Sequence, residues 1–186
     1  PRAAAPAAAS EETRAIFAEA ASAFLQLAKI NTLHERRASD ASWKAAELFT
    51  QAGETVRAVQ LYRQFATERP EDPLVPRALL RVGQLLQGAG KLLSAVEAYQ
   101  QCYRRFPRTL DGGLALVPLA RCYMALGPDR LEMAEKTLRV VLEESELFTP
   151  RAPEFADAIF LLGDVLGRRG KYEGAIATLE EALGRY

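Results

Sequence analysis

The feature that most constrains the fold of this chain is a spacing that recurs along it. A glycine stands five residues before an alanine, and a large residue follows four residues after that alanine. A small residue lies seven residues before the glycine, and a large residue stands three residues after that small residue. Such a period predicts a repeat architecture, because one copy alone cannot bury its apolar face. The regular copies are Ala46, Phe49, Gly53, Ala58 and Tyr62; Gly83, Leu86, Gly90, Ala95 and Tyr99; and Gly163, Leu166, Gly170, Ala175 and Leu179.

A fourth copy lies between the second and the third and carries an insertion. Ala120 and Tyr123 supply the small and large residues, and Gly127 follows in register. The next alanine, Ala134, comes seven residues after the glycine instead of five, and Leu138 takes the last large position. The chain is therefore predicted to hold four repeat units, with boundaries at 39–75, 76–112, 113–155 and 156–186.

The pattern inside each unit is typical of two helices joined by a tight turn. Apolar residues recur three and four apart on both sides of the glycine, which is the period of an amphipathic helix. The glycine can take the left-handed conformation that ends a helix. Pro70 and Pro107 close the first two units, because proline cannot continue a helix. The small residues let the two backbones approach while the large ones fill the space beside them.

The second unit reads Leu79, Val82-Gly83, Leu86, Ala95, Tyr99, Cys102 and Pro107. In these positions it resembles the tetratricopeptide repeat family, whose pattern is a large residue, Leu-Gly or Leu-Ala, a Tyr-like residue, Ala, a Phe-like residue and Pro. The resemblance covers residues 39–186, with a period longer than the family's usual length of about 34 residues. It implies an all-α solenoid of stacked antiparallel helical hairpins, wound into a right-handed superhelix.

Two segments precede the predicted array. Residues 1–9 are rich in Ala and Pro and are typical of a linker, with the tail of a cleaved signal peptide as the alternative. Residues 10–38 are predicted to form a leading helix and a connector, with Ser10 as its N-cap. This helix either packs on the first unit or stays exposed for a partner. The last copy stops at Tyr186, before its closing proline, so we interpret the chain as a piece of a longer protein.

The composition argues against several classes of function. The 24 Lys and Arg balance the 24 Asp and Glu, which removes the simple electrostatic case for binding nucleic acid or an anionic membrane. No apolar run approaches the roughly 18 residues that a membrane span needs, so no direct membrane insertion is predicted. Two cysteines cannot form a disulfide framework.

Catalytic chemistry is not indicated by any motif. The run Gly88-Ala89-Gly90-Lys91 lacks the further glycine and the Ser or Thr of a phosphate-binding loop, since Leu85 and Leu92 hold those positions. His34 has no second His and no nearby Cys to complete a metal site, and is predicted to be a solvated connector residue. We therefore predict no enzyme activity, no cofactor and no metal. Packing roles are predicted for Cys102 and Cys122, and ordinary solvated surface positions for Glu143-Glu144 and Arg168-Arg169.

The family resemblance implies that the first helices of successive units line a concave surface. Trp43, Leu80, Val117 and Phe160 stand at one equivalent position and are expected to form an apolar stripe. Leu114 and Asp157 stand at the same position within their repeats as Arg77 does within its own. The alternative is that these side chains pack against neighbouring helices. The predicted partner-binding residues are Trp43, Glu47, Arg77, Leu80, Arg81, Gln84, Val117, Arg121, Met124, Phe160 and Asp164.

These features together predict a non-catalytic protein–protein interaction scaffold. Its concave groove would take a helix or peptide that is apolar, with acidic groups facing Arg77, Arg81 and Arg121. Trp43 and Glu47 replace the Lys and Asn of the family's carboxylate clamp, so a clamp for a C-terminal carboxylate is not expected. The alternatives are a structural spacer or assembly subunit without a ligand, and an accessory domain of an enzyme encoded outside this chain.

Two further expectations concern assembly and compartment. An apolar end face on the last hairpin would allow end-to-end self-association or contact with adjacent subunits of a larger assembly. The run Tyr103-Arg104-Arg105-Phe106-Pro107 resembles bacterial envelope-type members of the family. That likeness implies the bacterial periplasm or cell envelope, with the cytoplasm as the alternative.

Overall fold

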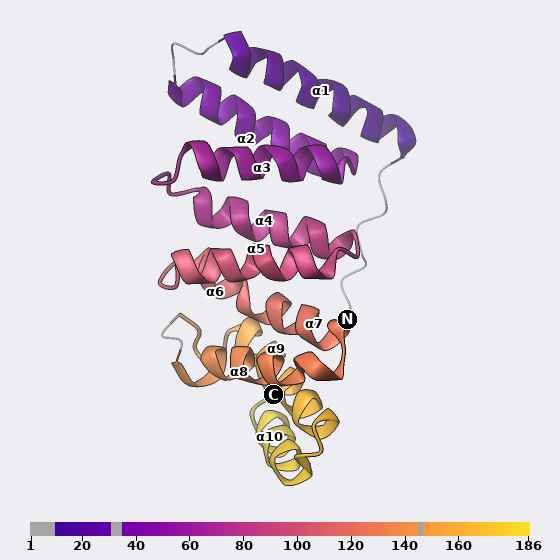
Figure 1. Cartoon of the computed structure of the whole chain (residues 1–186), viewed down its shortest axis with the longest axis vertical. Coiled ribbons are helices and arrows are strands. Elements are labelled where there is room, and N and C mark those ends of the chain that lie inside the picture. Colours follow the sequence, from indigo (N-terminus) through magenta and orange to yellow (C-terminus); the bar gives the residue numbers. More distant parts are fainter. Residues whose placement is uncertain (1–9, 31–34, 145–146) are drawn as a thin grey trace. The chain divides into compact units, whose positions relative to one another are not determined.

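The computed structural model describes residues 10–30, 35–144 and 147–186 (Figure 1). The described part is helical, with no strand among these residues, as the repeat spacing predicts. None of its helices is both long and apolar enough to cross a membrane. The predicted linker 1–9 and the connector residue His34 lie outside the described residues.

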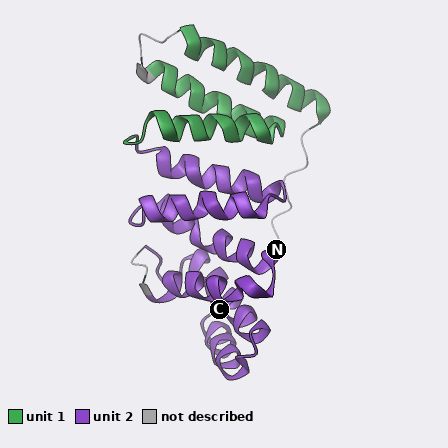
Figure 2. Ribbon diagram, viewed as in Figure 1, with its two compact units in different colours: residues 1–72 green, residues 73–186 purple. Residues whose placement is uncertain are grey.

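The chain divides into two compact units, residues 1–72 and 73–186 (Figure 2). Unit 1 contains α1 (Glu11–Ile30), α2 (Glu35–Ala52) and α3 (Thr55–Glu68). Unit 2 contains α4 (Val75–Gly88), α5 (Leu92–Arg105), α6 (Leu110–Leu114), α7 (Leu116–Leu126), α8 (Leu131–Arg139), α9 (Pro153–Arg168) and α10 (Tyr172–Arg185). The predicted repeat boundaries stay a prediction; the helices that open the four repeats begin at Glu35, Val75, Leu110 and Pro153, one to four residues earlier.

Three of the helix pairs close with the same glycine turn. Gly53, Gly90 and Gly170 have φ angles of 78°, 72° and 75°, a region in which a side chain would be strained. After each glycine, the next backbone N–H donates to the carbonyl five residues back. These bonds run from Glu54 to Phe49, from Lys91 to Leu86 and from Lys171 to Leu166, each at 2.9 Å. This pattern caps the end of the first helix and turns the chain directly into the second.

Small residues permit close helix packing inside these pairs. A Cβ atom at Gly83 of α4 would overlap the ring of Tyr99 on α5, which is fully buried. The Tyr99 hydroxyl donates a hydrogen bond of 2.8 Å to Gln87 Oε1. In α9, a Cβ at Gly163 would lie 2.5 Å from Cδ2 of Leu179 on α10. The small and large positions of the repeat are therefore contact partners in the α4–α5 and α9–α10 hairpins.

The third repeat departs from the regular hairpin. Its first helix is split at Ala115 into α6 and α7, and Thr109 caps α6 by accepting a hydrogen bond of 3.2 Å from the Gly112 N–H. Gly127 has a φ of 121° and leads into a 3₁₀ turn that accommodates the inserted residues before α8. Helix α8 continues as a π-helical stretch, Val140–Glu144. The sequence pattern predicted neither the split nor the π-helical end.

The connector after this stretch folds back onto α6. A Cβ at Gly113 would lie 2.8 Å from Leu147 Cδ1 and 2.9 Å from Phe148 Cε2, so the glycine makes room for both side chains. Phe148 is buried. Pro153 then occupies the first turn of α9, where its missing N–H costs nothing.

Helix α1 packs along α2 within unit 1. The Ser10 hydroxyl accepts a hydrogen bond of 3.2 Å from the Thr13 N–H, so the predicted N-cap is confirmed. Ala21 is the fully buried residue of this helix, and Ile16 and Ile30 are exposed. Phe17, Phe24 and Leu25 of the leading helix are half-buried, so large as well as small apolar side chains lie on its partly covered side.

Candidate functional site

A groove in unit 2 is built from the first helices of three successive repeats. Helices α4, α7 and α9 contribute to it, and α9 does so with its N-terminal residues. The end of α6 contributes as well. Its volume is about 290 Å³. The lining residues are Leu80, Gln84, Leu114, Val117, Pro118, Arg121, Pro153, Glu154 and Asp157.

The groove has an apolar floor and a charged rim. Leu80 and Val117 are 5% and 6% exposed, so they form the floor and also belong to the core. Arg121 Nη2 on α7 donates to Asp157 Oδ2 on α9 at 2.7 Å. Both side chains are about half exposed, and an ion pair of this kind contributes only about 0–1 kcal/mol. An incoming carboxylate could therefore replace Asp157 on the guanidinium at little cost.

Four of the predicted partner-binding residues line this groove: Leu80, Gln84, Val117 and Arg121. Pro118, Pro153 and Glu154 also line it but were not predicted. Pro153 and Glu154 precede the predicted start of the last repeat. The signal that identifies them is the proline itself, since proline is favoured in the first turn of a helix.

Other predicted residues of unit 2 lie outside the groove lining and have local partners. Arg77 Nε lies 3.6 Å from Asp111 Oδ1, and Arg81 Nη1 donates to Gln84 Oε1 at 3.1 Å. Met124 is half-buried. Asp164 accepts a hydrogen bond of 3.0 Å from Arg168 on the same helix. Phe160 is 39% exposed and its ring centroid lies 6.3 Å from that of Tyr186.

The two predicted residues of unit 1 face their own hairpin. The Trp43 ring packs edge-on against Tyr62 and Phe65 of α3, with centroid distances of 5.2 and 5.3 Å. Its Nε1–H donates to Glu47 Oε1 at 3.1 Å, and Lys44 pairs with the other carboxylate oxygen of Glu47. Through these contacts the indole of Trp43 packs α2 against α3.

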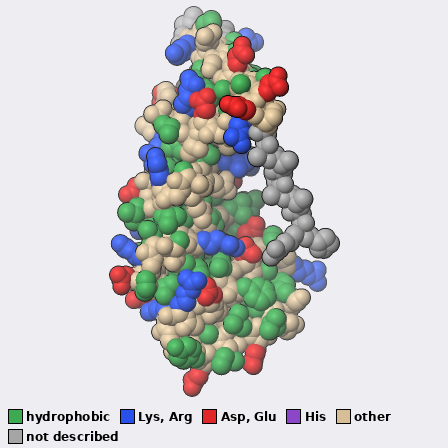
Figure 3. Space-filling view, turned by 90° about the vertical axis from the view of Figure 1, so that its right-hand side faces the viewer, with side chains coloured by type: hydrophobic (Ala, Val, Ile, Leu, Met, Phe, Trp, Pro, Cys, Tyr) green, Lys and Arg blue, Asp and Glu red, His purple; other side chains and the backbone are tan. Residues whose placement is uncertain are grey.

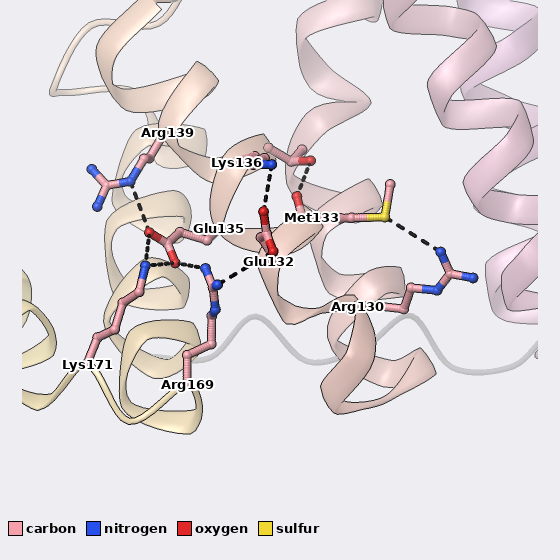
Figure 4. A network of polar contacts seen from close by, with 9 residues as sticks. Arg130, Glu132, Met133, Glu135, Lys136, Arg139, Arg169 and Lys171 are labelled. Atoms are coloured by element: carbon pink, nitrogen blue, oxygen red, sulfur yellow. Dashed lines mark hydrogen bonds and ion pairs between the residues drawn. The ribbon is translucent and has the colours of Figure 1, made fainter.

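A second cluster of charged residues ties α8 to the turn between α9 and α10 (Figure 4). Glu135 of α8 is 6% exposed and accepts hydrogen bonds from Arg169 and from Lys171, the latter at 3.0 and 2.9 Å. Arg139 Nε lies 3.4 Å from the same carboxylate, and Arg169 also lies 3.8 Å from Glu132. The carboxylate therefore neutralises cations from two neighbouring repeats.

The prediction that Arg169 is an ordinary solvated residue is wrong. Its side chain is only 24% exposed and is paired with the buried Glu135 carboxylate. Burial alone would raise the pKa of the Glu135 carboxyl. Hydrogen bonds from Lys171 and Arg169, and their charges, outweigh that effect and hold the pKa below its ordinary value.

The thiols are placed for packing and not for chemistry. Cys102 is fully buried and its Sγ donates to the Pro76 carbonyl at 3.2 Å. Burial, with a smaller effect of the Asp111 charge, raises its pKa to about 12. Burial raises the pKa of Cys122 to about 11. Within the described ranges, no group of three or more His, Cys, Asp or Glu could hold a metal ion.

We expect both thiols to be inert toward dithionitrobenzoate in the folded chain at pH 8. The thiolate is the reacting form, and the raised pKa values keep its population very small. Both should react once guanidinium has unfolded the chain, which absorbance at 412 nm would follow. A Val56→Cys variant, at an exposed position, serves as the reactive control. Rapid reaction of the parent chain would contradict the burial of both cysteines.

Comparisons with known families agree with this architecture. Two family models described as tetratricopeptide repeat match the chain, one over residues 14–73 and 130–186, the other over residues 77–109. A TPR repeat-containing protein of Treponema pallidum (strain Nichols) is 36% identical over 91 residues. The match covers 48% of this chain and 36% of that protein, so the chain spans only about a third of the relative's length.

Solved structures of the same fold are more distant in sequence. The nearly identical TPR-like repeats of a putative kinesin light chain from Podosopora anserina align with a TM-score of 0.67 at 18% identity, over 94% of this chain and 92% of that one. MamA aligns with a TM-score of 0.66 at 16% identity, over 94% and 91%. The Rap conjugation gene regulator of plasmid pLS20, in complex with the Phr* peptide, aligns with a TM-score of 0.57 at 16% identity, over 94% and 50%. The predicted all-α solenoid of helical hairpins is thereby confirmed.

Proposed function

Because the chain belongs to the tetratricopeptide repeat family, we propose that it is a non-catalytic scaffold that binds a segment of another protein in the groove of unit 2. The family and its fold support a role in protein–protein interaction in general. The narrower proposal rests on one observation, the groove formed by α4, α7 and α9.

The groove supports an extended peptide or a single helix as the ligand. A floor of Leu80 and Val117 suits apolar side chains, whose burial drives association. Arg121 and Gln84 at the rim suit an acidic or carbonyl group on the ligand. The solved complex of the Rap regulator with the Phr* peptide gives an example of this fold with a peptide bound.

The test uses a displayed library of random 12-residue peptides, selected on the immobilised chain. Selected peptides should be apolar with at least one acidic residue. Their affinity, measured by isothermal titration calorimetry, should fall about tenfold or more for Arg121→Glu. The reason is that the glutamate at the rim would repel the ligand's carboxylate. Arg63→Glu, an equal charge change at an exposed position of α3, should bind like the parent.

The outcome that contradicts the proposal is equally specific. If no peptide is selected, or if the Arg121→Glu and Arg63→Glu variants bind equally well, the groove is not the binding site. A structural spacer or an assembly subunit without a dedicated ligand would then be the better account of this chain.

A further inference from the structure

A second hollow of unit 2 lies between the second helices of two successive repeats and is here called the α5–α8 pocket. Its volume is about 170 Å³. Residues of α7 form its floor, since Leu116, Leu119 and Tyr123 are buried, and half-buried or exposed residues of α5 and α8 form its rim. The lining residues are Gln100, Tyr103, Arg104, Leu116, Leu119, Tyr123, Lys136, Thr137 and Val140.

The α5–α8 pocket is separate from the groove described above, although α7 lines both. Residues three and four apart on a helix share a face. Leu116, Leu119 and Tyr123 are spaced in this way and line the pocket, whereas Val117 and Arg121 are spaced four apart and line the groove. The two hollows have no lining residue in common, so they lie on different faces of α7.

The size and the lining of the pocket suit one aromatic side chain. An apolar cavity of about 150 Å³ can hold a benzene ring, so this hollow has room for a phenyl group. Aliphatic side chains of α7 and α8 line it, together with the rings of Tyr103 and Tyr123. The Tyr123 hydroxyl accepts a hydrogen bond of 2.5 Å from Gln100 Nε2, which ties the floor to the rim. A preformed pocket of this kind is typical of the site that takes an aromatic anchor.

Cations without acidic partners stand beside the pocket. Arg104 lies on its rim, and Arg105 and Arg108, at the end of α5 and in the turn after it, are exposed. None of these three arginines forms an ion pair with a residue that the structure describes. On the face drawn in Figure 3, by contrast, cationic and anionic side chains are interspersed, as is ordinary for a protein surface. The unpaired arginines therefore favour an acidic ligand.

A fourth cation on the rim is held only loosely. Lys136 Nζ lies 2.7 Å from Glu132 Oε1 one turn earlier on α8 (Figure 4). Both side chains are mostly exposed, and ion pairs in such surroundings are weak. Lys136 can therefore turn to a carboxylate of a ligand, facing Arg104 across the pocket from the other helix.

We propose that the α5–α8 pocket binds a segment of another protein that carries one aromatic side chain flanked by acidic residues. The ring enters the pocket, and the carboxylates meet Arg104 and Lys136 on its rim. Residues 1–9, the longest stretch outside the described ranges, contain no acidic and no aromatic residue, so that stretch does not supply the ligand. This contact is independent of the peptide proposed for the groove, because the two hollows share no lining residue.

The probe is a synthetic peptide, Gly-Asp-Glu-Phe-Glu-Asp-Gly with blocked ends, titrated to millimolar concentration into the nitrogen-15-labelled chain. Amide resonances of Leu119 and Thr137 should shift, and those of Leu80 and Asp157 in the groove should stay in place. The affinity should fall with salt, since part of the attraction is electrostatic. Alanine in place of the phenylalanine should weaken binding about fivefold or more. Lysine in place of the four acidic residues should weaken it about tenfold or more.

Variants of the chain separate the pocket from other surfaces. Arg104→Glu should weaken binding of the probe about tenfold or more, and its exposed position tolerates the change in the folded chain. Arg63→Glu makes the same change at an exposed position of α3 and should bind like the parent. Arg121→Glu should also leave the affinity unchanged, which distinguishes the pocket from the groove. Circular dichroism of each variant verifies that its helicity is retained.

Several outcomes would overturn the proposal. The absence of shifts at millimolar peptide, or equal binding of the phenylalanine and alanine peptides, would show that the pocket takes no aromatic anchor. Binding lost in Arg121→Glu but kept in Arg104→Glu would place the probe in the groove, which leaves the proposed function standing and this inference refuted. Equal shifts with a short oligothymidylate would make the arginines a general anion surface. A dimer of the parent abolished by Arg104→Glu, seen by light scattering, would make a second copy the occupant.

Discussion

Replacing Gly83 with alanine should destabilise the chain, while the same replacement at Gly88, five residues further along α4, should leave it equally stable or more stable. At Gly83 the added methyl group would overlap the Tyr99 ring, with Cζ only 2.8 Å away. The ring is fully buried and held by Gln87, so it has no room to move aside. Overpacking of this kind costs about 1–3 kcal/mol, and Gly83→Leu should cost more.

Gly88 supplies the matched control within the same helix. A Cβ there meets nothing within 4 Å, and the residue is exposed. Alanine should therefore leave the stability unchanged or raise it by up to about 0.5–1 kcal/mol, the value for a helix interior, because Gly88 is the last residue of α4. The measurement is guanidinium unfolding followed by circular dichroism. If Gly83→Ala unfolds at the same midpoint as the parent, α4 and α5 do not pack in the register described above.

Replacing Glu135 with alanine should cost about 2–4 kcal/mol of folding free energy. Removing one partner of a buried ion pair typically costs about 3–5 kcal/mol. The expected value is somewhat lower because Lys171 and Arg139 are partly exposed and can be hydrated once their partner is gone. Glu143→Ala is the control, since that exposed carboxylate pairs only with Arg139 among the described residues and should contribute about 0–1 kcal/mol.

The Glu135 contribution should also depend on pH in a defined direction. Its pKa is lower in the folded chain than in the unfolded one, so the unfolded state binds a proton first as the pH falls. The stabilisation is complete above the unfolded pKa of about 4.3 and is lost as the pH falls through the folded value. A Glu135→Gln variant should therefore lose less stability than the parent between pH 6 and pH 3. Equal losses in both would contradict the role of this carboxylate.

Much of the fold could be predicted because two local requirements, one of the backbone and one of side-chain packing, determine which residue types stand at the repeat positions. Gly53, Gly90 and Gly170 stand where the backbone needs a positive φ, and Gly83 and Gly163 stand where a large partner side chain needs room. The third repeat escaped this reasoning in part. The break at Ala115 and the π-helical end of α8 accompany the packing of Leu147 and Phe148 on Gly113, and no local pattern encodes that contact.

The candidate site was less predictable than the fold. The equivalent repeat positions of Leu80 and Val117 predicted that the two residues lie close together, as they do in the groove. These positions did not show that both side chains lie largely in the core. The pairing of Arg121 with Asp157 joins residues 36 positions apart on different helices, and only the packing of α7 beside α9 reveals it. Trp43 was expected on the stripe because of its position in the repeat, with packing as the alternative, and its contacts with Tyr62 and Phe65 fit that alternative.

The glycine turns have a mechanical consequence. Each turn joins two helices that pack directly on each other, so the contacts of a hairpin connect residues that are near in sequence. Load applied along unit 2 would be carried by α4–α5, α7–α8 and α9–α10 in series, and opening the last pair would also load the Glu135 contacts that tie α8 to the α9–α10 turn. Short loops also close quickly, so an opened pair would re-form fast once the load is removed. The unit would thus lengthen in separate steps and recoil, as an elastic element does.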